Sequence, residues 1–153
     1  MKKLTVIILC ITLISASLIP VSAAEVSRSG SEVVSQTVDV LDGGITVVDT
    51  ITLPNSNQRS NTRSATLYRE VYRDDVLIAQ IDVTGTFQYN GTSVSVVSKH
   101  ISKCETYNGW SFKQSSFISS AGSIVLTGKL TKPLYSSAEV RISLSCDPYG
   151  NIY

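Results

Sequence analysis

The chain has 153 residues, of which 16% are charged, and its formal net charge is +1. A near-neutral chain of this kind is neither a generally basic nucleic-acid-binding domain nor a polybasic membrane anchor. Its 38 Ser and Thr residues, together with many β-branched residues, are typical of a secreted β-protein.

The chain opens with the three regions of a secretory signal peptide. Two lysines come first, an apolar run covers residues 4–19, and small side chains occupy residues 21–24. We expect cleavage after Ala23 or Ala24. Removal of residues 1–23 leaves 130 residues, room for one domain, with 11 basic and 12 acidic side chains. No second apolar run follows, so we expect an extracellular product without a membrane span, whether it diffuses away or stays at the cell envelope.

Two alternatives to a cleaved signal remain. The leader could be a retained anchor, although its apolar run is shorter than the roughly 20 residues that span a bilayer. It could also mark a lipoprotein, because it contains Cys10. A lipid-modified Cys normally follows a small residue near the end of the apolar region, whereas Leu9 precedes Cys10 in its middle. We therefore favour cleavage.

An N-terminal arm is expected over residues 24–63. Residues 33–40 and 45–53 are β-like runs on either side of Leu41-Asp42-Gly43-Gly44, which predicts a hairpin. From residue 54 to residue 63 the chain has no apolar side chain after the Pro, which indicates a polar linker.

A main β-domain is expected over residues 64–153. Its clearest signal is the period-two alternation of residues 77–89, which predicts a half-buried strand. Gly85 in its middle predicts a bulge or a bend. Asn90-Gly91, which follows, is a strong hairpin signal. The side chains expected to face the core share one parity: Leu77, Ala79, Ile81, Val83, Phe87 and Tyr89.

The rest of the main domain repeats this pattern. Residues 124–130 and 138–146 alternate in the same way, and no part of the mature chain has sustained helical periodicity. Short alternating strands separated by turns predict an all-β fold, an antiparallel β-sandwich or small barrel, with an immunoglobulin-like architecture among the forms that fit.

Two cysteines, Cys104 and Cys146, remain after the leader is removed. In an exported domain a pair of cysteines most often forms one disulfide, so we expect Cys104 and Cys146 to be bonded. The alternative is two free thiols in a bacterium that makes few disulfides.

Catalytic constellations are incomplete in this sequence. His100, the one histidine, could be drawn with Cys104 and Glu105 as a nucleophilic triad. The alternative is an oxidised Cys104 beside a solvated His100, which we favour. No G-x-S-x-G elbow, H-E-x-x-H helix or phosphate-binding glycine loop is present. We expect no enzyme activity, no catalytic residue and no cofactor.

The carboxylates do not form a recognisable site either. Asp74 and Asp75 fit a turn, where Asp side chains bond to nearby backbone amides. Asp82 stands alone on the polar face of its strand, so a glycosidase pair would need unseen tertiary contacts. Three aspartates near the first turn lack the spacing of a calcium loop, and we expect no metal: Asp39, Asp42 and Asp49.

Aromatic residues give the most interesting candidate surface. Tyr107, Trp110 and Phe112 lie close together around an Asn108-Gly109 turn. Exposed rings of this kind could stack on sugars or anchor a protein partner. The alternative, which we favour for Trp110, is a core tryptophan, since buried aromatics are common in β-sandwiches.

Several motifs together resemble a family. Residues 83–92 (VTGTFQYNGT) resemble the G-x-F-x-Y-(N/D)-G hairpin of small secreted proteins of Gram-positive, clostridial-type bacteria. The other family marks follow in order: Trp110, a Ser/Gly-rich stretch at 119–123, and residues 144–151 (LSCDPYGN), which fit a C-terminal L-x-C-(D/S)-x-x-G-N. The resemblance covers residues 64–153. It implies export and a β-fold, and it transfers no catalytic or binding residue.

Two functions from different classes fit these observations. The first is a secreted, non-enzymatic β-domain that binds a partner at the cell envelope or in the medium, such as a cell-wall glycan, a protein or a second copy. The second is a secreted effector or toxin that acts on other cells, although neither strong cationic charge nor an amphipathic helix supports it. We favour the first, because every catalytic constellation is incomplete.

Overall fold

The computed structural model describes residues 30–55 and 61–153. The predicted signal peptide, its cleavage site and the alternatives drawn from Cys10 all fall outside these ranges. Within them no helix is long and apolar enough to cross a membrane.

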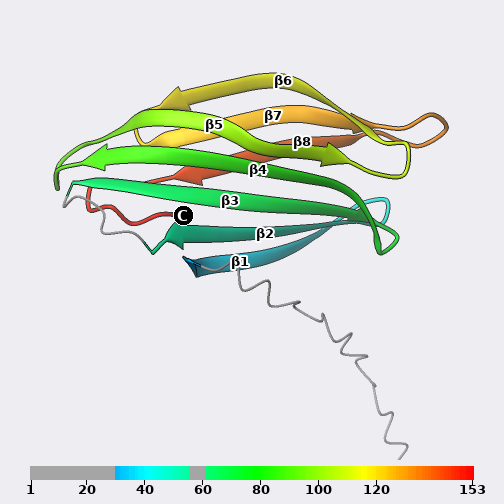
Figure 1. The fold of residues 1–153 in the computed structure, drawn as a ribbon. Helices are drawn as coiled ribbons and strands as arrows, with labels where there is room; N and C mark the ends of the chain where they lie inside the picture. Colours follow the sequence, from blue (N-terminus) through cyan, green and yellow to red (C-terminus); the bar gives the residue numbers. More distant parts are fainter. Residues whose placement is uncertain (1–29, 56–60) are drawn as a thin grey trace, which may run out of the picture.

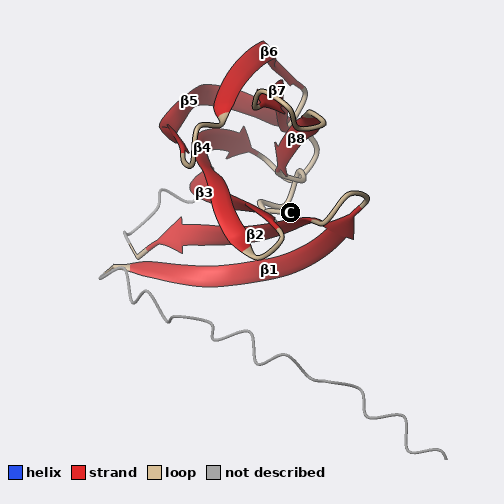
Figure 2. Ribbon diagram, turned by 90° about the vertical axis from the view of Figure 1, so that its right-hand side faces the viewer, coloured by secondary structure: helices blue, strands red, loops and turns tan. Residues whose placement is uncertain are grey.

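The described residues fold into antiparallel strands that form two sheets (Figure 1). The larger sheet has the strand order β1-β2-β3-β4-β5, and the smaller has the order β6-β7-β8. Seen from the side, the two sheets form the layers of a sandwich (Figure 2). The predicted all-β sandwich is therefore confirmed. The strands are β1 Ser31–Leu41, β2 Ile45–Pro54, β3 Thr62–Arg73, β4 Val76–Tyr89, β5 Val94–Thr106, β6 Ser111–Ser120, β7 Ser123–Thr131 and β8 Ala138–Ser145.

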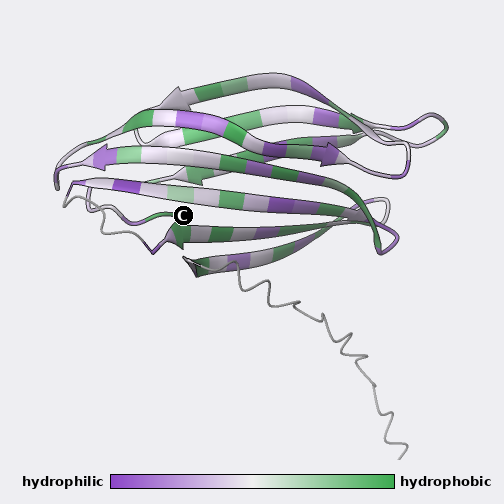
Figure 3. Ribbon diagram, in the orientation of Figure 1, coloured by the Kyte–Doolittle hydropathy of each residue, from purple (hydrophilic) through white to green (hydrophobic). Residues whose placement is uncertain are grey.

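Alternation along the strands builds the core between the sheets. Hydrophobic and hydrophilic segments follow one another along most strands (Figure 3). The inward row of β4 meets the inward rows of β7 and β8, because the sheets face each other there. The buried side chains of these three strands include Ala79, Ile81, Val83, Phe87, Ile124, Leu126, Leu130, Val140, Ile142 and Leu144.

The start of β4 departs from the predicted parity. The pairing of β3 with β4 shifts between Val71 and Tyr72, so that Val71 lies opposite Ala79 and Tyr72 opposite Leu77. The extra residue, Ile78, is 2% exposed, whereas Leu77 is half-buried. A bulge moves an additional side chain to the core face, which a simple period of two does not predict.

Gly85 lies at a close approach of the sheets. It keeps regular pairing with Ala65 and Lys99, and the unpaired residues lie on β5, one on each side of it. A Cβ at Gly85 would overlap Ile124 Cδ1 on the facing sheet. The glycine therefore permits tight packing, and the bends that we expected at Gly85 are bulges of the neighbouring strand.

The hairpin predicted in the N-terminal arm is present as β1 and β2. Strand β2 continues the larger sheet by pairing with β3, from Ile45 opposite Arg73 to Thr52 opposite Thr66. Ile45 and Ile51 are buried in the common core. The described part of the arm thus shares one sheet with the main domain.

The predicted disulfide is wrong, because Cys104 and Cys146 are both free. Cys104 is exposed on β5, opposite Ile81. Cys146 is buried, and Gly122 adjoins both its carbonyl oxygen and Val94 at the start of β5. Ten residues of strand separate Val94 from Cys104, which is roughly 30 Å. A disulfide requires Cα atoms within about 7 Å.

Candidate functional site

The three aromatic residues of the predicted surface do not form one surface. Trp110 is 6% exposed and belongs to the core. The Tyr135 ring lies beside it, with 5.8 Å between ring centroids, and the Arg73 guanidinium lies over both rings. Phe112 is half-buried, and its ring fills the space that Gly128 leaves by lacking a side chain. Trp110 is therefore the core tryptophan of the alternative that we favoured.

Tyr107 points instead to the outer face of the larger sheet. Its hydroxyl donates toward Glu105 Oε2 at 2.6 Å and lies 2.8 Å from Gln80 Oε1. The same Gln80 oxygen accepts a hydrogen bond from Lys103, and the Gln80 amide donates to Glu70. These hydrogen-bonded side chains lie across β3, β4 and β5. We call them the polar ladder: Glu70, Gln80, Lys103, Glu105 and Tyr107.

Tyr72 ends this ladder on β3. Its hydroxyl donates to Glu70 Oε2 at 2.7 Å. Burial, the hydrogen bond and the negative charge of Glu70 together raise the pKa of Tyr72 to about 12. Lys103 and Glu105 stabilise each other's charged forms, so that the pKa of Lys103 is raised and that of Glu105 is lowered, the latter first by its bond from Tyr107.

The hypothetical triad of His100, Cys104 and Glu105 is spread along β5. His100 is exposed opposite Thr84, and Glu105 is engaged by Tyr107 and Lys103. Although Cys104 is exposed, partial desolvation raises the pKa of its thiol, which is the opposite of the shift that activates a nucleophilic cysteine. Across residues 30–55 and 61–153 no group of three or more His, Cys, Asp or Glu side chains could hold a metal ion.

The edges of the two sheets show a clearer functional contrast. An unpaired edge presents main-chain groups that can accept a further strand, so proteins usually cover or charge it. Three arginines on the inner row of β3 each donate to a main-chain oxygen. The oxygen that Arg69 binds lies on β8 itself, and those that Arg63 and Arg73 bind lie in the segments that flank β8. Arg63 bonds to Gly150 at 2.7 Å, Arg69 to Arg141 at 2.7 Å and Arg73 to Ser136 at 3.2 Å.

The C-terminal residues cover the end of β8. Tyr153 and Ser145 exchange two main-chain hydrogen bonds, of 2.8 and 3.0 Å, and Cys146 forms a bridge with Ile152. The edge of β8 is therefore occupied at one end by the C-terminal residues and further along by the Arg69 side chain.

β5 and β6, the edges on the other side of the sandwich, are joined by Lys99. Its ammonium group donates to the Phe117 carbonyl at 2.9 Å and lies 4.9 Å from the centre of the Phe117 ring. The pairing of β5 shifts at two places and that of β6 at one. Bulges and lysines are the usual devices that prevent strand addition at an edge.

β1 lacks the cations and the neighbouring strand that close the other edges, although its pairing with β2 shifts once, between Val33 and Ser35. Its one strand partner among the described residues is β2, and no Lys or Arg occurs between residues 30 and 55. Figure 2 shows β1 as the outermost strand, on the opposite side of the molecule from β6. Five of its apolar side chains are exposed: Val33 60%, Val34 42%, Val38 50%, Val40 78% and Leu41 48%. We call strand Ser31–Leu41 with these side chains the β1 edge.

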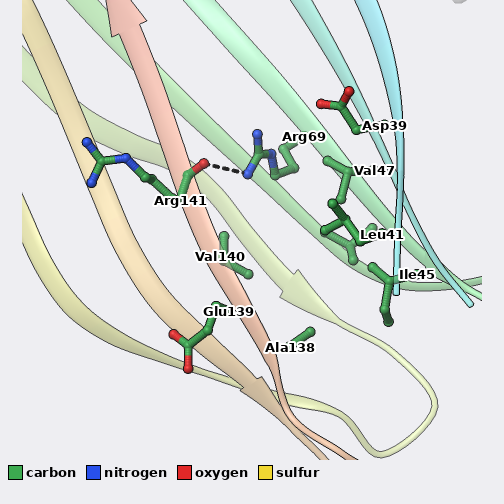
Figure 4. A pocket seen from close by; sticks show the side chains of 10 residues that line it. Asp39, Leu41, Ile45, Val47, Arg69, Ala138, Glu139, Val140 and Arg141 are labelled. Carbon is green, nitrogen blue, oxygen red and sulfur yellow. Dashed lines mark hydrogen bonds between the residues drawn. The ribbon is translucent and has the colours of Figure 1, made fainter. Parts of the chain in front are cut away.

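A groove of about 220 Å³ runs beneath the β1 edge, between it and β8 (Figure 4). Asp39 and Leu41 form its β1 wall, and residues 138–141 form its β8 wall. The Arg69 side chain crosses the groove to the Arg141 carbonyl, as the dashed line in Figure 4 shows. Arg69 thus connects β3 to β8. β1 lies outside this connection between the two sheets.

Sequence reasoning found the β1 hairpin but assigned no function to its outer edge. The sequence does contain one signal of an open edge. Four valines occupy both odd and even positions of this strand, so they point to both of its faces, and no Lys or Arg is nearby. The strand order, which the sequence does not give, was needed to place them at an edge.

No protein-family model, curated protein or solved structure matches this chain at a significant level. The resemblance to clostridial-type secreted proteins stays a prediction.

Proposed function

We propose that this chain is an exported, non-enzymatic interaction domain that binds a polypeptide at the cell envelope or in the extracellular medium. The observation that carries the proposal is the β1 edge. It is the one edge among the described strands that neither cations nor a neighbouring strand close, and it exposes five apolar side chains.

Addition of a strand to β1 would pair its outward main-chain groups and would also cover its exposed apolar side chains. An incoming extended segment would form main-chain hydrogen bonds along the edge, and its side chains would cover the valines on both faces. Full burial of an exposed valine or leucine contributes about 1.5–3 kcal/mol. Five half-exposed side chains would therefore add several kcal/mol to the main-chain bonds.

The non-enzymatic part of the proposal has separate support. On the outer face, Glu70, Lys103, Glu105 and Tyr107 are engaged with one another or with Gln80 in the polar ladder, and the Cys104 thiol has a raised pKa. A catalytic site would instead bring unengaged acid, base or nucleophile groups together in a cleft.

Binding assays with matched variants test this function. The full chain is expressed with its own leader in an exporting host, and intact mass gives the N-terminus of the product. Retention on isolated cell walls and on proteins of the spent medium is then measured. We compare the wild type with Val38→Lys/Val40→Lys and with Val97→Lys, which changes an equally exposed valine (58%) on β5.

We expect saturable retention of the wild type and of the β5 control, and its loss in the β1 variant. Thermal unfolding checks that all three are folded. Equal loss in both variants would overturn the proposal, as would absence of retention from every fraction by a chain that also does not bind a second copy of itself.

A further inference from the structure

The partner of the β1 edge can be argued from the other edges of the same molecule. We propose that β1 pairs with β1 of a second copy, in antiparallel orientation about a two-fold axis near Gln36. This inference rests on the proposed function and names the polypeptide that β1 binds.

The first argument is that a second copy offers one suitable edge. Its β8 edge is occupied by Arg69, with Arg63 and Arg73 bonded to the segments that flank β8, and its β5 and β6 edges are joined by Lys99. A copy approaching with any of these edges would have to break hydrogen bonds between cationic side chains and carbonyls. Contact between two β1 edges breaks none of these bonds, and it closes into a dimer because the same surface serves on both sides.

The second argument is the register. Gln36 is the central residue of Ser31–Leu41, so a two-fold pairing there runs along the strand in both copies. The irregularity of β1 between Val33 and Ser35 then lies opposite Val38 of the second copy, and pairing is regular on either side of it. Val34 then faces Val38 of the second copy. Asp39 faces Val33, and Glu32 faces Val40. No carboxylate lies directly opposite another, which would be destabilising. β-Branched pairs in this arrangement are favourable in antiparallel sheets.

The third argument is size. Eleven paired residues at about 3.3 Å per residue give a contact about 36 Å long. With the side chains on both faces, the pairing would bury on the order of 1,000 Å², near the lower limit of specific interfaces. The two five-stranded sheets would become one continuous sheet, and the apolar side chains of β1 would gain neighbours. We therefore expect a reversible dimer that forms as concentration rises.

Sedimentation of the purified, exported product tests the inference without any cell fraction. The wild type and Val97→Lys are expected to pass from monomer to dimer with increasing concentration. Val38→Lys/Val40→Lys removes four valines from the pairing. The lysine at position 40 gains Glu32 of the second copy as a partner, whereas the lysine at position 38 faces Val34, so we expect the dissociation constant to rise about tenfold or more.

Hydrogen exchange on the wild type keeps the test valid if a variant folds poorly. Amides of residues 31–41 should gain protection as concentration rises, while those of β5 should not change. The dimer should also persist or tighten in high salt, because the apposed strands both carry acids and salt screens their repulsion.

The outcomes separate the inference from the proposed function. A wild type that stays monomeric, with unchanged exchange in β1, overturns the dimer. If the same monomer is retained on walls or medium proteins through β1, the proposed function stands with another partner. Dimerisation that Val38→Lys/Val40→Lys does not weaken, or that salt abolishes, also overturns pairing through β1.

Discussion

Arg69 and Asp49 lie opposite each other on β3 and β2 and form a two-pronged ion pair, in which Arg69 Nε is 2.7 Å from Asp49 Oδ1. Their side chains are only 13% and 17% exposed. The remaining Arg69 nitrogen donates to the Arg141 carbonyl on β8. One side chain thus connects β2, β3 and the second sheet.

Loss of this arginine should destabilise the sandwich. Arg69→Ala leaves the half-buried Asp49 carboxylate unpaired and uncovers the β8 edge, so we expect a loss of about 3 kcal/mol in the free energy of unfolding. Urea unfolding measures it. The matched control is Lys129→Ala, which breaks a surface pair with Glu139 (side-chain exposures 45% and 78%) and should cost at most about 0.5 kcal/mol. Equal losses would contradict a special role for Arg69.

Gly85 should be intolerant of any side chain. Gly85→Ala puts a methyl group against Ile124 Cδ1 and the Phe87 ring, and we expect a loss of about 1–3 kcal/mol by overpacking. The variant Ile124→Val removes the colliding carbon. In denaturant unfolding, Gly85→Ala/Ile124→Val should therefore lose about 1 kcal/mol less than the sum of the two single variants. Strict additivity would show that the contact is not the cause.

The two thiols should differ in reactivity, because Cys104 is exposed and Cys146 is 3% exposed. We expect an alkylating reagent to modify one thiol in the native protein and both in denaturant. Peptide mass mapping should place the first label on Cys104. Reduction should leave the number of labelled thiols unchanged. Two thiols that react only after reduction would restore the disulfide that the fold argues against.

Tyr72 should make the protein sensitive to alkaline pH. Its pKa is raised from 10.0 to about 12, so the folded state holds the phenolic proton more tightly than the unfolded state. This stabilisation is complete below pH 10 and is lost as the pH rises through 12. Melting temperatures measured from pH 9 to 12 should fall less steeply in Tyr72→Phe than in the wild type. Parallel curves would contradict the assignment.

The fold class and much of the core could be predicted from the sequence. Alternation within one strand reports which side chains share a face, and this was enough to place Ile81, Val83 and Phe87 in the core. The signal failed at Leu77 and Ile78, because a bulge is set by the pairing of two strands. Alternation also did not decide whether Trp110 is a core or a surface residue, because the neighbouring positions do not show which residues pack against its ring.

Local sequence patterns were enough to predict an all-β chain with a first hairpin over residues 33–53, and they place valines on both faces of its first strand. The arrangement of the strands in space shows that the cysteines lie apart, that Arg69 of β3 closes the edge of β8, and that no cation or further strand among the described residues covers β1. The physical reason is the distance along the chain over which each kind of interaction acts. Periodicity acts between residues two apart, whereas the bond that closes the β8 edge joins Arg69 to Arg141, 72 residues later. Which edge remains open depends on strand order, and therefore on contacts between distant parts of the chain.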